Sequence, residues 1–147
     1  MTSIFDVVNY ILSKNGEMTS MKLQKLTYYS QAWNLAWEGK PLFDEEFEAW
    51  ANGPVCSELF RVHKGQFIVN KEIFEDFGDE NNLNKTEKEN IDEVLKTYGD
   101  KEPYWLSNLT HMERPWKEIR LKNNCKDGDF CNEIIPKDLM QEYYAGL

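Results

Sequence analysis

Apolar residues near the start of the chain recur with the spacing of a helix. Separations of three and four residues place them on one helical face that begins near residue 4. Ser3 and Asp6 match a capping box, in which each side chain accepts a hydrogen bond from the backbone of the first turn. Gly16 can adopt the left-handed conformation in which helices commonly end. The apolar stripe consists of Ile4, Val7, Val8, Ile11 and Leu12.

A second and longer helix is predicted over about residues 21–38. Thr19 or Ser20 can cap its start, and Gly39 followed by Pro41 ends it. Apolar and aromatic side chains occupy more of its circumference than one stripe would, so we expect a central helix that is buried on more than one side. These positions are Leu23, Leu26, Tyr28, Tyr29, Ala32, Trp33, Leu35, Ala36 and Trp37.

The period changes to two over residues 42–50, which predicts a short strand or a pair of strands. The Asn-Gly-Pro sequence at 52–54 predicts a turn. Pro54 suits the first position of a helix, and we expect that helix to run to about Lys64. A further short extended segment is predicted within residues 65–69.

The second half of the chain predicts several short helices. A helical turn is expected near residues 73–77, and Thr86 with Glu89 matches a capping box for a helix that ends at Gly99. Proline is favoured at the start of helices, and three prolines mark further starts. The expected inward side chains of the first of these helices are Trp105, Leu106 and Leu109. Residues 133–135 are expected to be extended. The three prolines are Pro103, Pro115 and Pro136.

These elements predict one compact, mainly α domain spanning residues 1–147. Short helices surround the central helix, and a small β-hairpin element accompanies them. The chain of 147 residues is long enough to bury a core, and 14% of its residues are aromatic. This composition excludes a disordered chain.

The net charge of −9 argues against binding nucleic acid by charge neutralisation, which needs a basic surface. Ten acidic residues but only four lysines fall within 75–102, where we expect either a solvated surface or an electrostatic docking surface. No apolar run has the length of a membrane span, and no signal-peptide pattern opens the chain. Three cysteines without a disulfide pattern favour the cytoplasm. We therefore expect a cytoplasmic protein.

Candidate chemistry is sparse. His111 and Glu113 are the only pair close in sequence that could perform acid–base catalysis, and the alternative is that the histidine braces a turn between two helices. A metal site would require Cys56, His63, Cys125 and Cys131 to converge, and their spacing is not typical of metal ligands. We predict no catalytic residue, no cofactor and no metal.

Five tryptophans and seven tyrosines are many for a small domain. Such side chains usually pack in the core, but they are also frequent anchors of protein interfaces. An exposed cluster of them would indicate a surface that binds a partner.

Four blocks of the sequence, in this order, resemble the Panacea domain family, also described as SocA-like antitoxins and GepA-like phage-associated proteins. The resemblance extends from about residue 4 to residue 144, although Thr27, Ser30 and Cys56-Ser57 depart from the usual pattern. The blocks are MKLQKLTYYSQAW at 21–33, GKPLFDEEFEAW at 39–50, GPV at 53–55, and LTH with PW within 109–116.

The resemblance implies a binding protein rather than an enzyme, namely an antitoxin that neutralises a toxin by direct contact in a two-gene pair. The expected partner is the cognate toxin. Alternatives are a phage-associated adaptor that delivers a partner to a protease, and a small hydrolase or transferase that uses His111 and Glu113. Neither nucleic acid nor membrane is expected as a partner, and homo-oligomerisation is left open. We expect partner contacts, with a purely structural role as the alternative, at Lys22, Lys25, Tyr28, Tyr29, Gln31, His111, Glu113 and Trp116.

Overall fold

A computed structural model of the chain describes residues 2–147. Within this range no helix is long and apolar enough to cross a membrane. Helices account for most of the regular structure. In chain order they are α1 (Ile4–Asn15), α2 (Ser20–Glu38), α3 (Ser57–His63), α4 (Lys71–Phe74), the 3-10 helix η1 (Glu80–Asn82), α5 (Lys85–Tyr98), α6 (Pro103–Met112), α7 (Arg114–Lys122) and α8 (Lys137–Ala145).

The short strands form two antiparallel groups. In the larger sheet, β2 (Phe47–Trp50) lies between β3 (Gly53–Val55) and β5 (Ile134–Ile135). The smaller group pairs β1 (Met18–Thr19) with β4 (Ile68–Val69). The structure thus confirms the mainly helical fold with a small β-hairpin element, to which a strand near the C-terminus is added.

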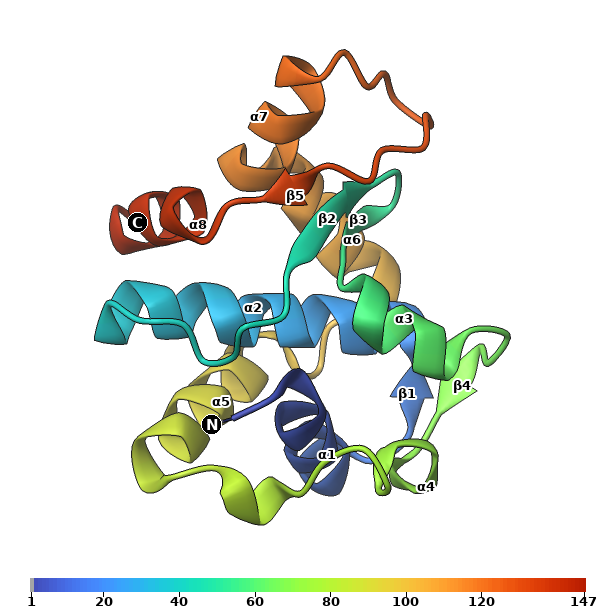
Figure 1. Cartoon of the computed structure of the whole chain (residues 1–147), viewed down its shortest axis with the longest axis vertical. Coiled ribbons are helices and arrows are strands. Elements are labelled where there is room, and N and C mark those ends of the chain that lie inside the picture. Colours follow the sequence, from blue (N-terminus) through green and yellow to red (C-terminus); the bar gives the residue numbers. More distant parts are fainter. Residues whose placement is uncertain (1) are drawn as a thin grey trace.

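The central position predicted for α2 is confirmed. Figure 1 shows α2 crossing the middle of the molecule, with α1, α4 and α5 on one side and α7, α8 and the larger sheet on the other. Helices α1, α5, α6 and α8 all pack against it. This arrangement places segments from both halves of the chain around one helix.

The predicted ends of α1 and α2 are confirmed. Ser3 and Asp6 form the capping box at the start of α1, and Gly16 follows its end with a φ of 72°. Thr19 accepts a hydrogen bond from the backbone of Lys22 at the start of α2. Local sequence is sufficient for these boundaries because each cap bonds within its own helical turn.

The prediction that Pro54 begins a helix is wrong. Pro54 pairs with Ala49 in β3, at the edge of the sheet, and α3 begins only at Ser57. An edge strand tolerates proline because no ladder bond needs its missing N–H. Its carbonyl oxygen accepts a hydrogen bond from Lys25 Nζ at 3.2 Å, which ties the strand to α2.

Two predictions in the second half also need correction. The capping box of α5 is formed by Asn84 and Glu87 rather than by Thr86 and Glu89. Both pairs have the required spacing, so the sequence pattern alone does not distinguish them. Trp105 was expected to point inward, but 45% of its surface is exposed.

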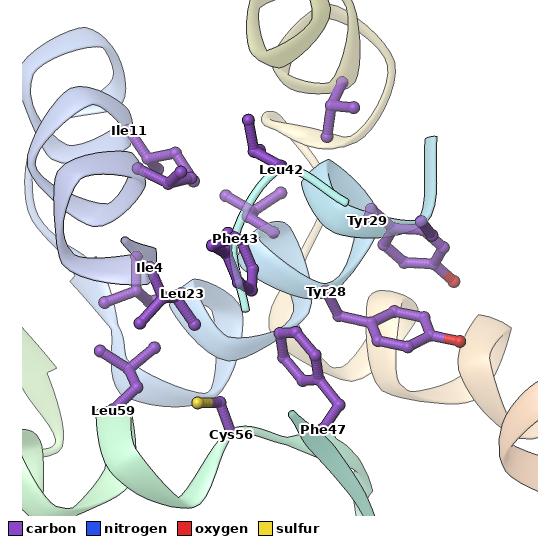
Figure 2. Close-up of a cluster of buried hydrophobic side chains, with 14 of the residues drawn as sticks. Ile4, Ile11, Leu23, Tyr28, Tyr29, Leu42, Phe43, Phe47, Cys56 and Leu59 are labelled. Carbon is purple, nitrogen blue, oxygen red and sulfur yellow. The ribbon is translucent and has the colours of Figure 1, made fainter. Parts of the chain in front are cut away.

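The hydrophobic core lies mainly against α2 and joins it to the helices and strands on both sides. Figure 2 shows this cluster, in which Leu23 of α2 lies beside Ile4 of α1 and Tyr28 of α2 lies beside Phe47 of β2. Tyr28 packs edge-to-face on Phe47 at 5.3 Å between ring centroids. Fully buried members include Ile4, Ile11, Leu23, Leu26, Tyr29, Phe43 and Leu59.

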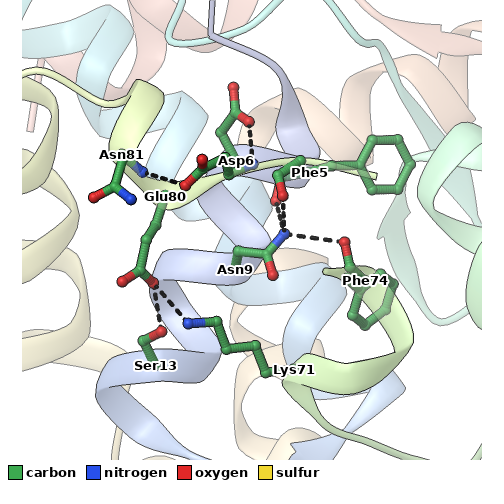
Figure 3. A network of polar contacts seen from close by, with 10 residues as sticks. Phe5, Asp6, Asn9, Ser13, Lys71, Phe74, Glu80 and Asn81 are labelled. Carbon is green, nitrogen blue, oxygen red and sulfur yellow. Dashed lines mark hydrogen bonds and ion pairs between the residues drawn. The ribbon is translucent and has the colours of Figure 1, made fainter. Parts of the chain in front are cut away.

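Polar side chains of α1 fix the segment that carries α4 and η1. Asn9 Nδ2 donates to the carbonyl oxygens of Phe74 and Gly78 at 3.1 and 3.2 Å (Figure 3). The Asp6 carboxylate accepts from the backbone N–H of Asp79 at 2.8 Å. These side chains thus supply hydrogen-bond partners to backbone groups that no helix or sheet pairs.

Candidate functional site

The residues expected to contact a partner on α2 are mostly buried. Lys25, Tyr28, Tyr29 and Gln31 are at most 1% exposed, whereas Lys22 is partly exposed. Such burial leaves these four side chains almost no surface for a protein partner to cover, although Lys25 also lines a pocket. The contact role predicted for these residues remains a prediction, and the bonds described next give them a structural one.

Two glutamines of α2 bind backbone segments that pass alongside the helix. Gln31 accepts from the N–H of Leu42 and donates to the carbonyl oxygen of Phe43, each at 2.7 Å. Gln24 makes the same two-point contact with the backbone of Cys56, at 2.9 and 3.2 Å. The two glutamines stand seven residues apart, which places them on the same side of the helix.

Glu113, at the junction of α6 and α7, is held by tyrosines of α2 and α8. Tyr29 and Tyr144 donate to its Oε1 at 2.6 and 2.8 Å, and the Tyr144 hydroxyl lies 3.1 Å from that of Tyr28. Burial raises the pKa of Glu113 above its ordinary value, although the two tyrosine hydrogen bonds oppose this shift. The network fixes the α6–α7 junction from inside the molecule.

His111 and Trp116 stack on each other at the same junction. Their rings lie 4.0 Å apart between centroids and 7° from parallel. Trp116 Nε1 donates to the carbonyl oxygen of Trp50 at 2.8 Å, which ties α7 to β2. The pKa of His111 is lowered, first by burial and then by the positive charge of Lys25.

The structure gives His111 and Glu113 different partners. The imidazole stacks on Trp116, while the carboxylate is bound by Tyr29 and Tyr144. Within residues 2–147 no hydrogen bond joins the two side chains. Nor do the described residues bring together three or more His, Cys, Asp or Glu side chains as a group able to hold a metal ion.

The environment of Lys25 is the least predictable from the sequence. A lysine near the start of a helix is usually solvated, yet this one is 1% exposed and burial lowers its pKa to about 7. The glycine at position 53 is the one related feature of the sequence. In the structure its φ is 120°, and a Cβ at this position would lie 2.5 Å from Lys25 Cε. Sequence alone could not connect these two residues.

Exposed apolar side chains gather on the outer side of α6 and α7. Met112 and Leu121 are 69% and 77% exposed, and they line a shallow groove of about 330 Å³ together with Tyr143 of α8. Arg114 also lines the groove and forms ion pairs with Glu118 and Glu142 at 3.0 and 3.3 Å. We call this the α6–α7 surface. Its residues are Met112, Arg114, Lys117, Glu118, Leu121 and Tyr143.

Comparisons with known proteins agree on one family. A profile of the family described as "Antitoxin SocA-like, Panacea domain" matches residues 23–117. Antitoxin SocA of Caulobacter vibrioides is 28% identical over 127 residues, which cover 77% of this chain and 68% of that protein. No solved structure matches the chain significantly. The chain therefore belongs to the SocA-like Panacea domain family.

Proposed function

We propose that this protein is an antitoxin that neutralises a partner toxin by binding it directly. The observation that carries the proposal is the family match over residues 23–117, supported by the similarity to Antitoxin SocA. The three free cysteines suit a reducing compartment, and we propose that the protein acts in the cytoplasm as one domain over residues 1–147.

We place the toxin contact on the α6–α7 surface. Exposed apolar groups beside charged ones are typical of protein interfaces, and Met112 and Leu121 supply them here. Arg114 provides a planar cation at the same place, and arginine is frequent among residues that dominate binding. This surface includes part of the junction in which partner contacts were predicted.

The buried residues of the predicted site hold in place the two helices that carry this surface. Glu113 ends α6 and begins α7, so its bonds to Tyr29 and Tyr144 hold the two helices at a fixed angle. A rigid surface loses less conformational freedom on binding, which favours affinity. In this proposal the tyrosines of α2 and α8 position the contact residues without touching the toxin.

Helix α5, the longest element of the acidic segment at 75–102, lies away from the α6–α7 surface (Figure 1). Figure 1 shows α5 on the opposite side of α2 from α7. We therefore expect the acidic side chains to steer a basic toxin at long range and to keep the protein soluble, rather than to form the contact itself.

Co-expression with the product of the neighbouring gene tests the proposal. The wild type should restore growth and co-purify with the toxin. A double variant with Met112→Asp and Leu121→Asp should weaken binding at least about tenfold, because charges would replace apolar anchors. The matched control is Phe67→Asp, at a 75% exposed position on the segment leading to β4.

The amount of toxin in the cell separates direct neutralisation from delivery to a protease. Direct neutralisation leaves the toxin level unchanged while growth recovers, whereas an adaptor lowers it. If the wild type neither restores growth nor forms a complex, the proposal fails. If Phe67→Asp weakens binding as much as the double variant does, the contact lies elsewhere.

A further inference from the structure

A pocket of about 340 Å³ lies between the start of α2, the β2–β3 hairpin, α3 and the loop at 128–130. Its volume is at the lower end of the range for small-molecule sites. Among the described residues that line it, Lys25 is the only Lys or Arg and there is no carboxylate. The lining residues that carry the argument are Gln24, Lys25, Trp50, Phe60, His63 and Phe130.

Aromatic rings form a continuous wall on one side of this pocket. Phe130 lies 5.7 Å from Trp50, and Trp50 lies 5.0 Å from Phe60, between ring centroids. Phe130 is 70% exposed and stands on a loop without regular structure. Exposed aromatic side chains beside a pocket are available to cover an apolar ligand.

Lys25 also lines this pocket, and its side-chain nitrogen has fewer partners than it can bind. An ammonium carries three N–H donors, and within residues 2–147 the Pro54 carbonyl oxygen is the only acceptor bonded to Nζ. No carboxylate of the described chain lies within 4.0 Å of it as an ion pair. Buried cations are normally paired, so an anion would satisfy what the chain leaves open.

The polar neighbours of Lys25 supply no anion. Gln24 Nε2 lies 3.0 Å from His63 Nε2, and the bonds of Gln24 to the Cys56 backbone fix Nε2 as the donor. His63 Nε2 is therefore the acceptor, and the ring is neutral. This agrees with the pKa of His63, which is lowered first by burial.

We propose that this pocket binds an apolar carboxylate, that is, one negative charge carried on an aromatic or aliphatic group. The carboxylate pairs with Lys25 Nζ, and the apolar part packs on Trp50, Phe60 and Phe130. Such a group is found in a free organic acid and at the C-terminus of a protein that ends in an apolar residue. This inference does not depend on the antitoxin function.

Isothermal titration of the full chain with phenylacetate, hydrocinnamate, indoleacetate and hexanoate tests the proposal, with the primary amide of each acid as its control. We expect at least one acid to bind in the millimolar range or better, and its amide to bind at least about tenfold more weakly. Equal binding of the acid and its amide, or no binding by any acid, overturns the proposal.

Two pairs of variants locate the site. Lys25→Met keeps the apolar stem and removes the charge, and it should abolish the preference for the acid; Lys22→Met, three residues earlier on α2 and outside the pocket wall, should not. Phe130→Ala should weaken binding several-fold, while Phe67→Ala, at a similarly exposed position, should leave it unchanged. Wild-type affinity in both Lys25→Met and Phe130→Ala contradicts the proposal.

Proton uptake gives a further readout. The titratable groups facing Lys25 are His63 of α3 and His111 of α6; the charges of Arg120 and Asp127 act on His111. Both histidines have lowered pKa values and are neutral at about pH 8, whereas Lys25, with a pKa of about 7, must gain a proton to pair with an anion. Binding heats in buffers of different ionisation enthalpy should reveal this uptake in the wild type, and its absence would contradict the pairing.

A peptide distinguishes the two sources of the carboxylate. A tetrapeptide of three alanines and a terminal phenylalanine is compared with its C-terminal amide. Binding of the peptide acid at least about tenfold tighter than hydrocinnamate indicates a protein C-terminus, because backbone contacts add to the terminal pair. Equal or weaker binding indicates a free organic acid. Either result is consistent with an apolar carboxylate that pairs with Lys25, and the two differ only in its source.

Discussion

At the scale of single residues, two buried ionisable groups stand out. Lys25 and Glu113 both lie inside the molecule without a charged partner among the described residues. Burial penalises the charged form of each group, so it lowers the pKa of Lys25 and raises the pKa of Glu113. Their effects on stability therefore depend on pH in opposite directions.

Stability should rise with pH through the titration of Lys25. Its pKa falls from 10.5 to about 7 on folding, so between these values the unfolded chain binds more protons than the native one. The free energy of unfolding then increases by up to about 1.4 kcal/mol per pH unit from this group. Lys25→Met should lack this increment in denaturant titrations between about pH 7 and 10, whereas Lys22→Met should retain it. If the free energy of unfolding changed with pH in the same way in the wild type and in Lys25→Met, the lowered pKa of Lys25 would be contradicted.

Glu113 should act in the opposite direction. Its folded pKa lies above the ordinary 4.5, so the native state holds the proton longer and stability falls as pH rises from 4.5 through the folded value. Glu113→Gln keeps an acceptor for Tyr29 and Tyr144 and should remove this fall. Glu113→Ala leaves the Tyr29 hydroxyl unpaired and the Tyr144 hydroxyl with only that of Tyr28 as partner, and it should cost about 1–3 kcal/mol in denaturant unfolding. Equal stability of the two variants would argue against the tyrosine network.

At the scale of elements, the ends of α1 and α2 and the presence of a hairpin were predictable, whereas the place of Pro54 in its second strand was not. Ser3, Gly16 and Gly39 set boundaries through bonds within their own turns, which the sequence displays directly. Pro54 was misplaced because proline is compatible both with a helix start and with an edge strand, and its bond to Lys25 joins it to a residue 29 positions away. The burial of Tyr28 and Tyr29 likewise depends on α8, which lies more than a hundred residues later.

The β2–β3 turn should be intolerant of a side chain at position 53. Gly53→Ala introduces a Cβ 2.5 Å from Lys25 Cε and 2.9 Å from Thr110 Oγ1, at a φ of 120°. Gly65→Ala is the matched control, since its φ is 85° but nothing lies within 4 Å. The control should lose about 1–2 kcal/mol from backbone strain, and Gly53→Ala about 1–3 kcal/mol more. Equal losses in thermal unfolding would mean that the close approach to Lys25 is not constraining.

At the scale of the whole molecule, α2 separates two sides with different properties. Helix α5, which belongs to the acidic segment at 75–102, lies on one side and α7 on the other (Figure 1). Met112 and Leu121, at the ends of α6 and α7, are exposed. The sequence indicated an acidic segment at 75–102, but only the packing around α2 shows that α5 and α7 lie on opposite sides of that helix (Figure 1). Lys25, Tyr28, Tyr29 and Gln31 are interior because α2 is covered on both sides. The family resemblance does not distinguish structural residues from contact residues.

Hydrogen–deuterium exchange of the protein with and without its co-encoded toxin tests the proposed contact most directly. Amides of α6 and α7, from Pro103 to Lys122, should become protected when the toxin binds, while those of α5, from Lys85 to Tyr98, should exchange as in the free protein. Protection confined to α5, or none at α6 and α7 in a complex that forms, would contradict the account.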